Sequence, residues 1–210
     1  MIKKNWKTLL ITSLVILLPV LAGVILWNRL PDQLPTHWNA SGEVDGWSSK
    51  PVAVFGLPLI LLAVHWLCAL GTSADPKKAD HAPKVLHLVL WIVPVLSVLL
   101  QMVTYATALG GSVPVETVMP VFMGLLFAII GNYLPKCKQN YTIGIKIPWT
   151  LHSEENWNKT HRLAGRIWMV GGLAIMLTGF FGGFLVCIPV TFVMVLVPIF
   201  YSYLLYRKGI

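Results

Sequence analysis

The chain has 210 residues, of which 56% are hydrophobic and 11% are charged, and its formal net charge is +8. A soluble globular domain is typically about 25% charged. The composition therefore excludes an ordinary soluble fold and indicates an integral membrane protein. The positive charge also raises nucleic-acid binding, but that function requires basic residues gathered on one soluble face.

Long apolar stretches divide the chain into predicted membrane spans, because a helix needs about 20 apolar residues to cross a bilayer. Four stretches are long enough for one crossing each: 8–27, 52–70, 85–109 and 115–134. The last stretch, 167–206, contains 40 residues and predicts two crossings joined by a turn at Gly182-Gly183. The sequence thus predicts an all-α polytopic membrane protein with six transmembrane helices.

Proline and small residues predict how these helices are shaped and packed. Prolines inside the spans predict kinks, since each removes a backbone hydrogen bond. Small residues at four-residue spacing, Ala174, Thr178 and Gly182, predict one close helix contact. The prolines concerned are Pro19, Pro58, Pro94, Pro120, Pro189 and Pro198.

Lysine and arginine in the short loops predict the orientation of the chain. Fourteen of the 16 basic residues fall on the side that holds both ends of the chain, and only Arg29 and Lys50 fall on the other. Both termini are therefore expected in the cytoplasm, with the first helix retained rather than cleaved as a signal peptide. The basic excess is explained by topology, so direct nucleic-acid binding is not expected.

The spans and loops suggest four segments. Residues 1–71 hold two spans and an ordered outer loop, 29–51. Residues 72–134 hold spans three and four, 135–166 hold a cytoplasmic loop and an amphipathic helix, and 167–210 hold spans five and six.

No Asp, Glu, Lys or Arg lies near the middle of any predicted span, which argues against coupled transport. The polar exceptions are His65, Gln101 and Asn132. Of the polar residues in the spans, His65 is the candidate for a functional role. It is either a functional residue or a neutral imidazole that serves the structure. The three cysteines follow no disulfide or zinc spacing and are treated as small apolar residues: Cys68, Cys137 and Cys187.

The outer loop is rich in proline and glycine and contains two tryptophans beside His37, Glu43 and Asp45. One interpretation is an interfacial cap, with the indoles at the level of the lipid headgroups. Another is an outward-facing surface that binds a peptide through its aromatic residues. A metal site at the three ionisable residues is a weaker alternative, because they lack strict ligand spacing.

The inner segment, residues 131–162, ends in a predicted helix that Ser153 caps. Helical spacing brings Glu154, His161 and Arg162 close together. The three interpretations are a buried salt-linked network, a docking surface for a cytoplasmic partner, and an acid–base or zinc site for an enzyme that also uses His152. No cofactor, metal or catalytic residue is predicted.

At these two loops the sequence resembles the SdpI family of bacterial membrane proteins, which is named for an immunity protein against a secreted killing peptide. The inner segment looks like the family's C-terminal signature, and the outer loop like its N-terminal domain of unknown function. The inner matches are Gly131-Asn132-Tyr133, Pro135-Lys136, Asn140-Tyr141, Gly144-Ile145, Pro148-Trp149-Thr150-Leu151, Glu154, Trp157 and Thr160-His161-Arg162; the outer matches are Leu30-Pro31, Pro35, His37-Trp38, Gly42, Asp45, Trp47 and Ser49-Lys50.

The resemblance implies a bacterial plasma-membrane protein that protects the cell from a peptide toxin, and whose engagement leads to capture of a winged-helix transcriptional repressor. It implies toxin-facing residues in the outer loop: His37, Trp38, Gly42, Asp45, Trp47 and Lys50. It implies partner-facing residues on the cytoplasmic side: Asn132, Tyr141, Gly144, Lys146, Pro148, Trp149, Thr150, Glu154, Trp157, Thr160, His161 and Arg162.

Two points qualify that inference. The family often has arginine where this chain has Lys146, and a lysine cannot make a planar two-pronged contact with a carboxylate. The alternative function is a membrane enzyme or small-molecule transporter that uses Glu154, His161 and Arg162.

Overall fold

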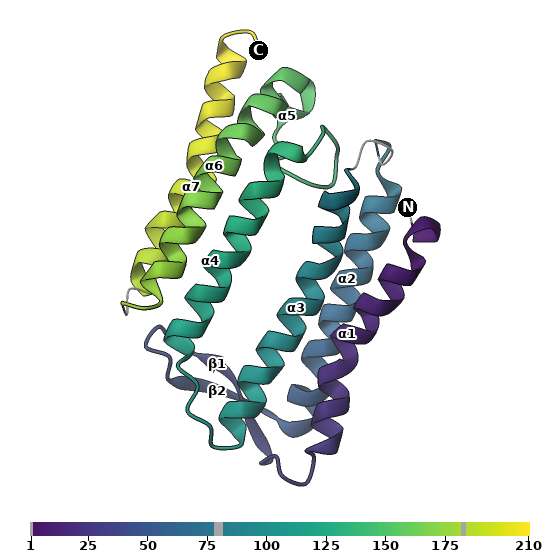
Figure 1. Ribbon diagram of the computed structural model, residues 1–210, viewed down its shortest axis with the longest axis vertical. Helices are drawn as coiled ribbons and strands as arrows, with labels where there is room; N and C mark the ends of the chain where they lie inside the picture. Colours follow the sequence, from purple (N-terminus) through teal and green to yellow (C-terminus); the bar gives the residue numbers. More distant parts are fainter. Residues whose placement is uncertain (1, 78–81, 182–183) are drawn as a thin grey trace. The chain divides into compact units, whose positions relative to one another are not determined.

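The computed structural model describes residues 2–77, 82–181 and 184–210, and most of them are helical (Figure 1). The long helices are α1 (Trp6–Ile25), α2 (Leu57–Ala74), α3 (Pro83–Ala108), α4 (Val115–Tyr133), α6 (Glu154–Thr178) and α7 (Phe184–Arg207). The shorter elements are η1 (Ile2–Lys4), β1 (Gln33–Trp38), β2 (Val44–Ser49), η2 (Val52–Gly56), η4 (Leu134–Lys136) and α5 (Pro148–His152).

Within the described ranges, five helices are long and apolar enough to cross a membrane: Trp6–Ile25, Val52–Ala74, Pro83–Ala108, Val115–Lys136 and Leu185–Arg207. They coincide with five of the six predicted spans. The remaining predicted span is the C-terminal part of α6. That helix begins with a charged half, so it does not meet the same criterion, and six crossings stay a prediction. The predicted turn at Gly182-Gly183 lies outside the described residues.

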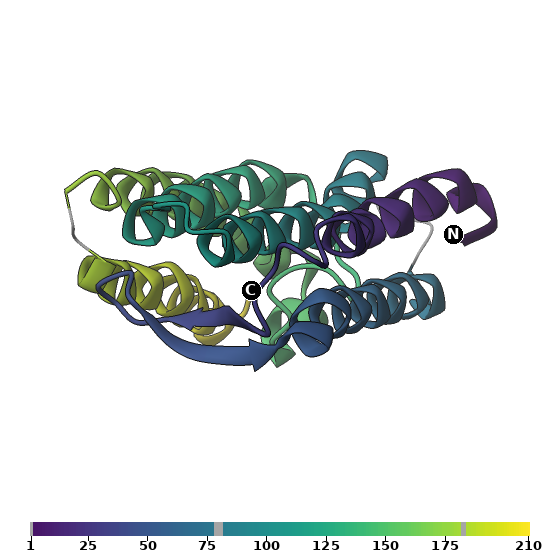
Figure 2. The same cartoon turned by 90° about the horizontal axis from the view of Figure 1, so that it is seen from below.

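The prediction of an all-α chain is wrong in the outer loop, where β1 and β2 form an antiparallel two-stranded sheet (Figure 2). The reason is local turn chemistry. Asn39 Oδ1 accepts hydrogen bonds from the N–H groups of Ser41 and Glu43, and Gly42 has a φ of 78°. Asparagine and glycine in this arrangement reverse the chain and bring the strands into register. This paired segment is called the hairpin below.

The chain packs as two compact units, one formed by Met1–Ser73 with Leu86–Val115 and the other by Ala74–Val85 with Glu116–Ile210. In the first unit, a polar ladder runs along one face of α3. Ser97, Gln101 and Tyr105 recur every four residues, all three are buried, and each donates a hydrogen bond to a backbone carbonyl. Their acceptors are the carbonyls of Ile16, Ala53 and Pro19, at 3.0 Å each.

One bond of the ladder, from Gln101, compensates for a proline. In a π-helical turn the carbonyl of residue i bonds to the N–H of residue i+5. η2 is such a turn, and Pro58 has no N–H to offer the carbonyl of Ala53. Gln101 Nε2 supplies the missing donor. The polar side chain therefore compensates for a proline inside an apolar segment.

His65 of α2 is also buried in the first unit. Its Nε2 lies 2.9 Å from the hydroxyl of Thr12 in α1. This hydrogen bond joins two neighbouring helices, which fits the structural interpretation of His65.

In the second unit, α4 and α6 are neighbouring helices (Figure 1). They meet along a seam of glycines. A Cβ added to Gly172 would lie 2.5 Å from the carbonyl oxygen of Gly124, and one added to Gly131 would lie 2.8 Å from that of Gly165. Gly165 and Gly172 are seven residues apart, as are Gly124 and Gly131, so the backbones meet at two successive heptads. This pairing is called the glycine seam.

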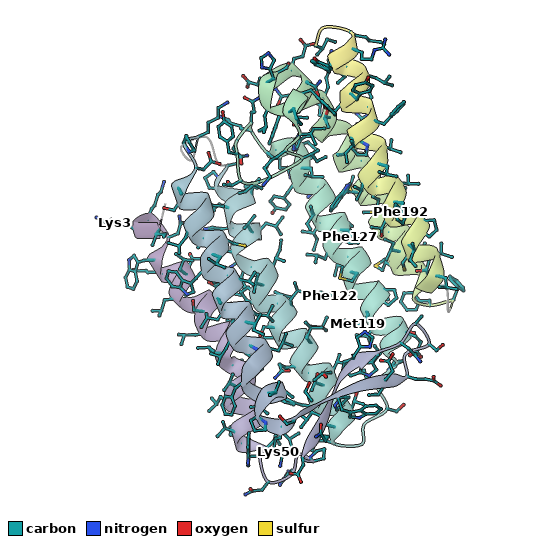
Figure 3. The ribbon with its side chains drawn as sticks, turned by 180° about the vertical axis from the view of Figure 1, so that it is seen from behind. Lys3, Lys50, Met119, Phe122, Phe127 and Phe192 are labelled. Atoms are coloured by element: carbon teal, nitrogen blue, oxygen red, sulfur yellow. The ribbon has the colours of Figure 1, made fainter. Side chains whose placement is uncertain are left out.

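The glycine seam is a close contact that the sequence did not predict. Of the predicted residues, Thr178 approaches α7, where its hydroxyl lies 3.3 Å from Sγ of Cys187. Ala174 lines a groove between α6 and α7, and Gly182 lies outside the described residues. Aromatic packing reinforces the seam, because Phe127 of α4, labelled in Figure 3, meets Trp168 of α6 edge-on at 5.5 Å between ring centroids.

A methyl group in the glycine seam should weaken the second unit. Gly172→Ala places a Cβ 2.5 Å from the Ala128 backbone nitrogen and from the Gly124 carbonyl oxygen. Overpacking of this kind costs about 1–3 kcal/mol. We expect a lower thermal midpoint for the purified variant in detergent. Gly71→Ala in α2 is the control, because its Cβ meets nothing within 4 Å. Equal midpoints for Gly172→Ala and the unmodified chain would contradict the seam.

Candidate functional site

The hairpin carries two exposed side chains, His37 and Asp45, that are joined by a hydrogen bond. Nδ1 of His37 lies 2.5 Å from Oδ1 of Asp45, and the two side chains are 71% and 44% exposed. Gly46 faces His37 across the strands, where an added Cβ would lie 2.9 Å from the His37 Cβ. The absence of a side chain at Gly46 thus lets the imidazole settle beside the carboxylate. Trp47, on the same strand, is 58% exposed.

Lys50 differs from the other residues predicted in the outer loop, because only 13% of its side chain is exposed. Its Nζ donates to the carbonyl of Trp27 at 3.2 Å, stands 5.4 Å from the centre of that indole ring, and lies 3.5 Å from Oδ1 of Asp32. Lys50 therefore ties the hairpin to the end of α1 (Figure 3). Its geometry is that of a structural anchor.

The weaker metal interpretation of this loop lacks geometric support. Glu43 accepts a hydrogen bond from Asn39 Nδ2 at 3.1 Å, so its carboxylate is engaged in the turn. Among the residues that the structure describes, no group of three or more His, Cys, Asp or Glu side chains could hold a metal ion.

The inner segment folds around Asn140, which is buried in the centre of residues 137–147, called the signature loop below. Its Nδ2 donates to the carbonyls of Lys138 and Ile143, at 2.8 and 2.9 Å. Its Oδ1 accepts from the N–H groups of Thr142 and Ile143, at 2.8 and 2.6 Å. One amide side chain thus replaces the backbone pairing that a helix or sheet would provide.

Asp75, which the sequence did not single out, holds the signature loop from within the second unit. The carboxylate is 2% exposed and accepts from the Tyr141 N–H at 3.0 Å and from the Thr142 hydroxyl at 2.8 Å. Gln139 is a second residue that the sequence missed. It donates to the carbonyls of Thr150 and Leu151 and accepts from Lys77. The scarcity of acids in this chain was the available signal for Asp75.

Trp157 and His161 of α6 form the floor beneath the signature loop. Their rings stack at 4.0 Å between centroids, and both side chains are buried. Trp157 Nε1 donates to the carbonyl of Cys137 at 2.7 Å. Gly144 has a φ of 115°, and a Cβ there would lie 2.5 Å from His161 Nε2. Only glycine fits over this ring pair, which explains its place in the motif.

The hydrogen bonds of His161 determine its protonation state. The Ile145 N–H donates to Nε2 at 3.0 Å, so Nε2 carries no proton. The proton is therefore on Nδ1, which donates to the Trp157 carbonyl at 2.8 Å. Burial lowers the pKa of His161 to about 4, although the bond to the Trp157 carbonyl opposes the shift. The imidazole is neutral at neutral pH, with both ring nitrogens engaged.

Buried polar side chains also hold α5 and α6 in place. The Thr150 hydroxyl lies 2.8 Å from the carbonyl of Ile145 and accepts from the Ile147 N–H at 3.1 Å. Asn156 Nδ2 donates to the Ser202 carbonyl at 3.0 Å, and Asn156 Oδ1 accepts from the Thr160 hydroxyl at 3.1 Å. The bond between Asn156 and Ser202 joins the start of α6 to α7.

The start of α6 confirms the predicted cap, since Ser153 Oγ accepts from the Asn156 N–H at 3.2 Å. The predicted cluster, however, does not assemble. His161 is buried, Glu154 and Arg162 are exposed, and no hydrogen bond or ion pair between described residues joins the three. A helical wheel places Glu154 and His161 on one face but ignores the signature loop that covers His161. An acid–base or transport site there is unsupported.

The remaining predicted residues separate into buried and accessible groups. Trp149 is half-buried and packs against the rings of Tyr203 and Tyr206, at 5.5 and 6.0 Å between centroids. Thr150, Trp157, Thr160 and His161 are buried and hold the fold together. The accessible residues are Asn132, Tyr141, Lys146, Pro148, Glu154 and Arg162.

Comparison with known proteins matches both loops. Residues 136–202 match the SdpI/YfhL protein family, and residues 14–62 match a domain of unknown function, DUF1648. Over 209 residues the chain is 27% identical to the protein named Immunity protein SdpI of Bacillus subtilis (strain 168). The aligned region covers 98% of this chain and 97% of that protein. The resemblance to the SdpI family is confirmed. No solved structure matches the chain.

The SdpI match contains all of the signature loop, α5 and α6 and most of α7. The DUF1648 match contains most of α1, the hairpin and the start of α2. Asp75 lies outside both matched ranges, yet it holds the SdpI signature loop in place. A contact from outside the matched regions is therefore part of this candidate site.

The hydrogen bonds of His161 predict that the signature loop weakens in acid. The folded pKa, about 4, lies below the ordinary value of 6.5. Protonation of His161 at Nε2 would break its hydrogen bond with the Ile145 N–H. The contribution of His161 to the stability of the signature loop is therefore complete above about pH 6.5, and it is lost as the pH falls toward 4. The difference corresponds to roughly 3 kcal/mol. We expect the protection factor of the Ile145 amide, which is its intrinsic exchange rate divided by the observed rate, to fall over this range.

His161→Gln should flatten this pH profile, because glutamine does not titrate. His152→Gln is the matched control, since His152 is exposed at the end of α5. An unchanged profile in His161→Gln would show that another group governs the signature loop.

Proposed function

We propose that this chain is a membrane immunity protein that protects its cell from a secreted, membrane-active peptide toxin. The observation that carries the proposal is similarity over nearly the whole length to a protein named as an immunity protein, 98% of one chain and 97% of the other. This similarity also favours a non-enzymatic role.

The proposed topology has six membrane crossings, bent at their prolines, with both termini on the cytoplasmic side of the bacterial plasma membrane. The apolar C-terminal half of α6 supplies the sixth crossing. Support comes from the lysine and arginine residues, because 14 of the 16 fall on the side of the termini. In this topology the hairpin faces outward and the signature loop faces the cytoplasm.

The hairpin is the proposed toxin-binding surface. Trp47 presents an exposed indole, and the neighbouring His37–Asp45 pair presents polar groups in a fixed arrangement. An aromatic anchor flanked by hydrogen-bonding groups is typical of peptide-binding surfaces. Trp38 and Gly42 are assigned supporting roles, at the strand end and in the turn, and Lys50 fixes the hairpin to α1.

The proposal includes a second, inward-facing activity, in which toxin binding leads to capture of a winged-helix repressor at the signature loop. The accessible side chains of Tyr141 and Lys146 support it, because a docking surface needs exposed groups on an ordered loop. The buried members of the motif hold that loop in shape.

Removal of the exposed indole should reduce protection. A sensitive bacterium that expresses the chain should survive the cognate peptide, and Trp47→Ala should raise the killing rate toward that of the empty-vector strain, because interface tryptophans often contribute 2 kcal/mol or more, about thirtyfold in affinity. Trp6→Ala is the matched control, since Trp6 is similarly exposed, 55% against 58%. Equal killing of the unmodified and empty-vector strains would exclude the immunity function.

The inward-facing activity should separate from protection. We expect the repressor to co-purify with membranes only when peptide is present, and Tyr141→Ala to abolish this while survival is retained. The substitution keeps the backbone N–H that bonds to Asp75, so the signature loop should stay folded. Loss of survival together with co-purification would contradict separate roles.

A further inference from the structure

An apolar groove between α6 and α7 ends at a basic side chain. The groove has a volume of about 580 Å³. Arg166 is the first of its α6 residues along the chain, and Ala174 the last. The other lining residues are apolar: Ile167, Val170 and Gly171 from α6, and Pro189, Val190, Val193 and Met194 from α7.

The glycine seam determines the depth of Arg166. Gly165, the preceding residue, packs against Gly131 in the last turn of α4. Gly131 lies five residues before the end of the candidate span Val115–Lys136, roughly 8 Å along the helix axis. Arginine side chains on a helix lean toward its N-terminus and can extend to the membrane surface. The guanidinium therefore reaches the level of the lipid headgroups at that end of α4.

The charge of Arg166 is unneutralised within the described part of the chain. Its side chain is exposed and has no hydrogen bond or ion pair with a described residue. Arg162, one turn earlier on α6, is in the same condition. Lys159 differs, because it pairs with Glu155 at 2.7 Å. A basic residue next to hydrocarbon generally has an anionic partner or reaches the interface.

We propose that this groove is a binding site for an anionic phospholipid. The guanidinium of Arg166 holds the phosphate through paired hydrogen bonds, and Arg162 adds a second positive charge. One acyl chain lies in the groove from Arg166 to Ala174, eight residues or roughly 12 Å of helix. The headgroup and the chain are thus recognised at the correct ends of one site. This inference is independent of toxin immunity.

The charge requirement can be tested on the full chain purified in detergent, with native mass spectrometry. The probes are dioleoylphosphatidylglycerol and dioleoylphosphatidylethanolamine, which share acyl chains and differ in net charge. We expect preferential retention of phosphatidylglycerol. Arg166→Gln should weaken its apparent affinity about five- to tenfold. Lys159→Gln, which removes the same charge from the same helix outside the groove, should leave it unchanged.

The chain-binding part of the site can be tested separately. Ala174→Phe should fill the groove and reduce binding while Arg166 remains. Leu173→Phe is the control, because Leu173 is exposed beside the groove but does not line it. If Ala174→Phe fails to fold, the comparison of Arg166→Gln with Lys159→Gln decides the proposal by itself.

Three results would overturn the proposal. The first is equal retention of both lipids by the unmodified chain. The second is equal phosphatidylglycerol affinity in Arg166→Gln and Lys159→Gln. The third is a lipid-independent dimer that Ala174→Phe dissociates, because the groove would then be occupied by a second copy of the chain.

Discussion

The structure depends on one constraint: an apolar chain in a membrane must satisfy its backbone polar groups from within. Gln101 supplies a donor to a carbonyl that Pro58 leaves without a partner, and Ser97 and Tyr105 place their own hydroxyl donors on backbone carbonyls of α1. Asn140 does the equivalent for the signature loop. Buried polar residues that look like candidate functional groups in the sequence are therefore engaged in structural contacts, and the accessible ones are the candidates for a functional role.

The two candidate sites are built on different principles. The hairpin presents polar and aromatic side chains on a short sheet whose shape comes from its turn, so its exposed residues can change without loss of the turn. The signature loop has no regular pairing and depends on Asp75, Asn140 and His161 to hold it. A substitution among those three residues alters the loop before it alters any surface contact.

The sequence predicted the elements that depend on local composition, and it missed those that depend on distant contacts. Hydropathy located five apolar helices, and Ser153 marked the start of α6. The strands were not predicted, because register shifts around His37 break the two-residue alternation on which strand prediction depends. Asp75 escaped because its partner Tyr141 is 66 residues away. The predicted cluster of Glu154, His161 and Arg162 was wrong, because helical spacing alone does not show that the signature loop covers His161.

The glycine seam has a mechanical consequence. Two helices that meet through backbone atoms at successive heptads cannot slip by one turn, since side chains would then strike the opposing backbone. The next compatible register is seven residues away, roughly 10 Å along the axis. The glycine seam therefore holds α4 and α6 in one fixed register. Because α6 also carries Trp157 and His161, on which the signature loop rests, the position of that loop depends on α4 as well as on α6.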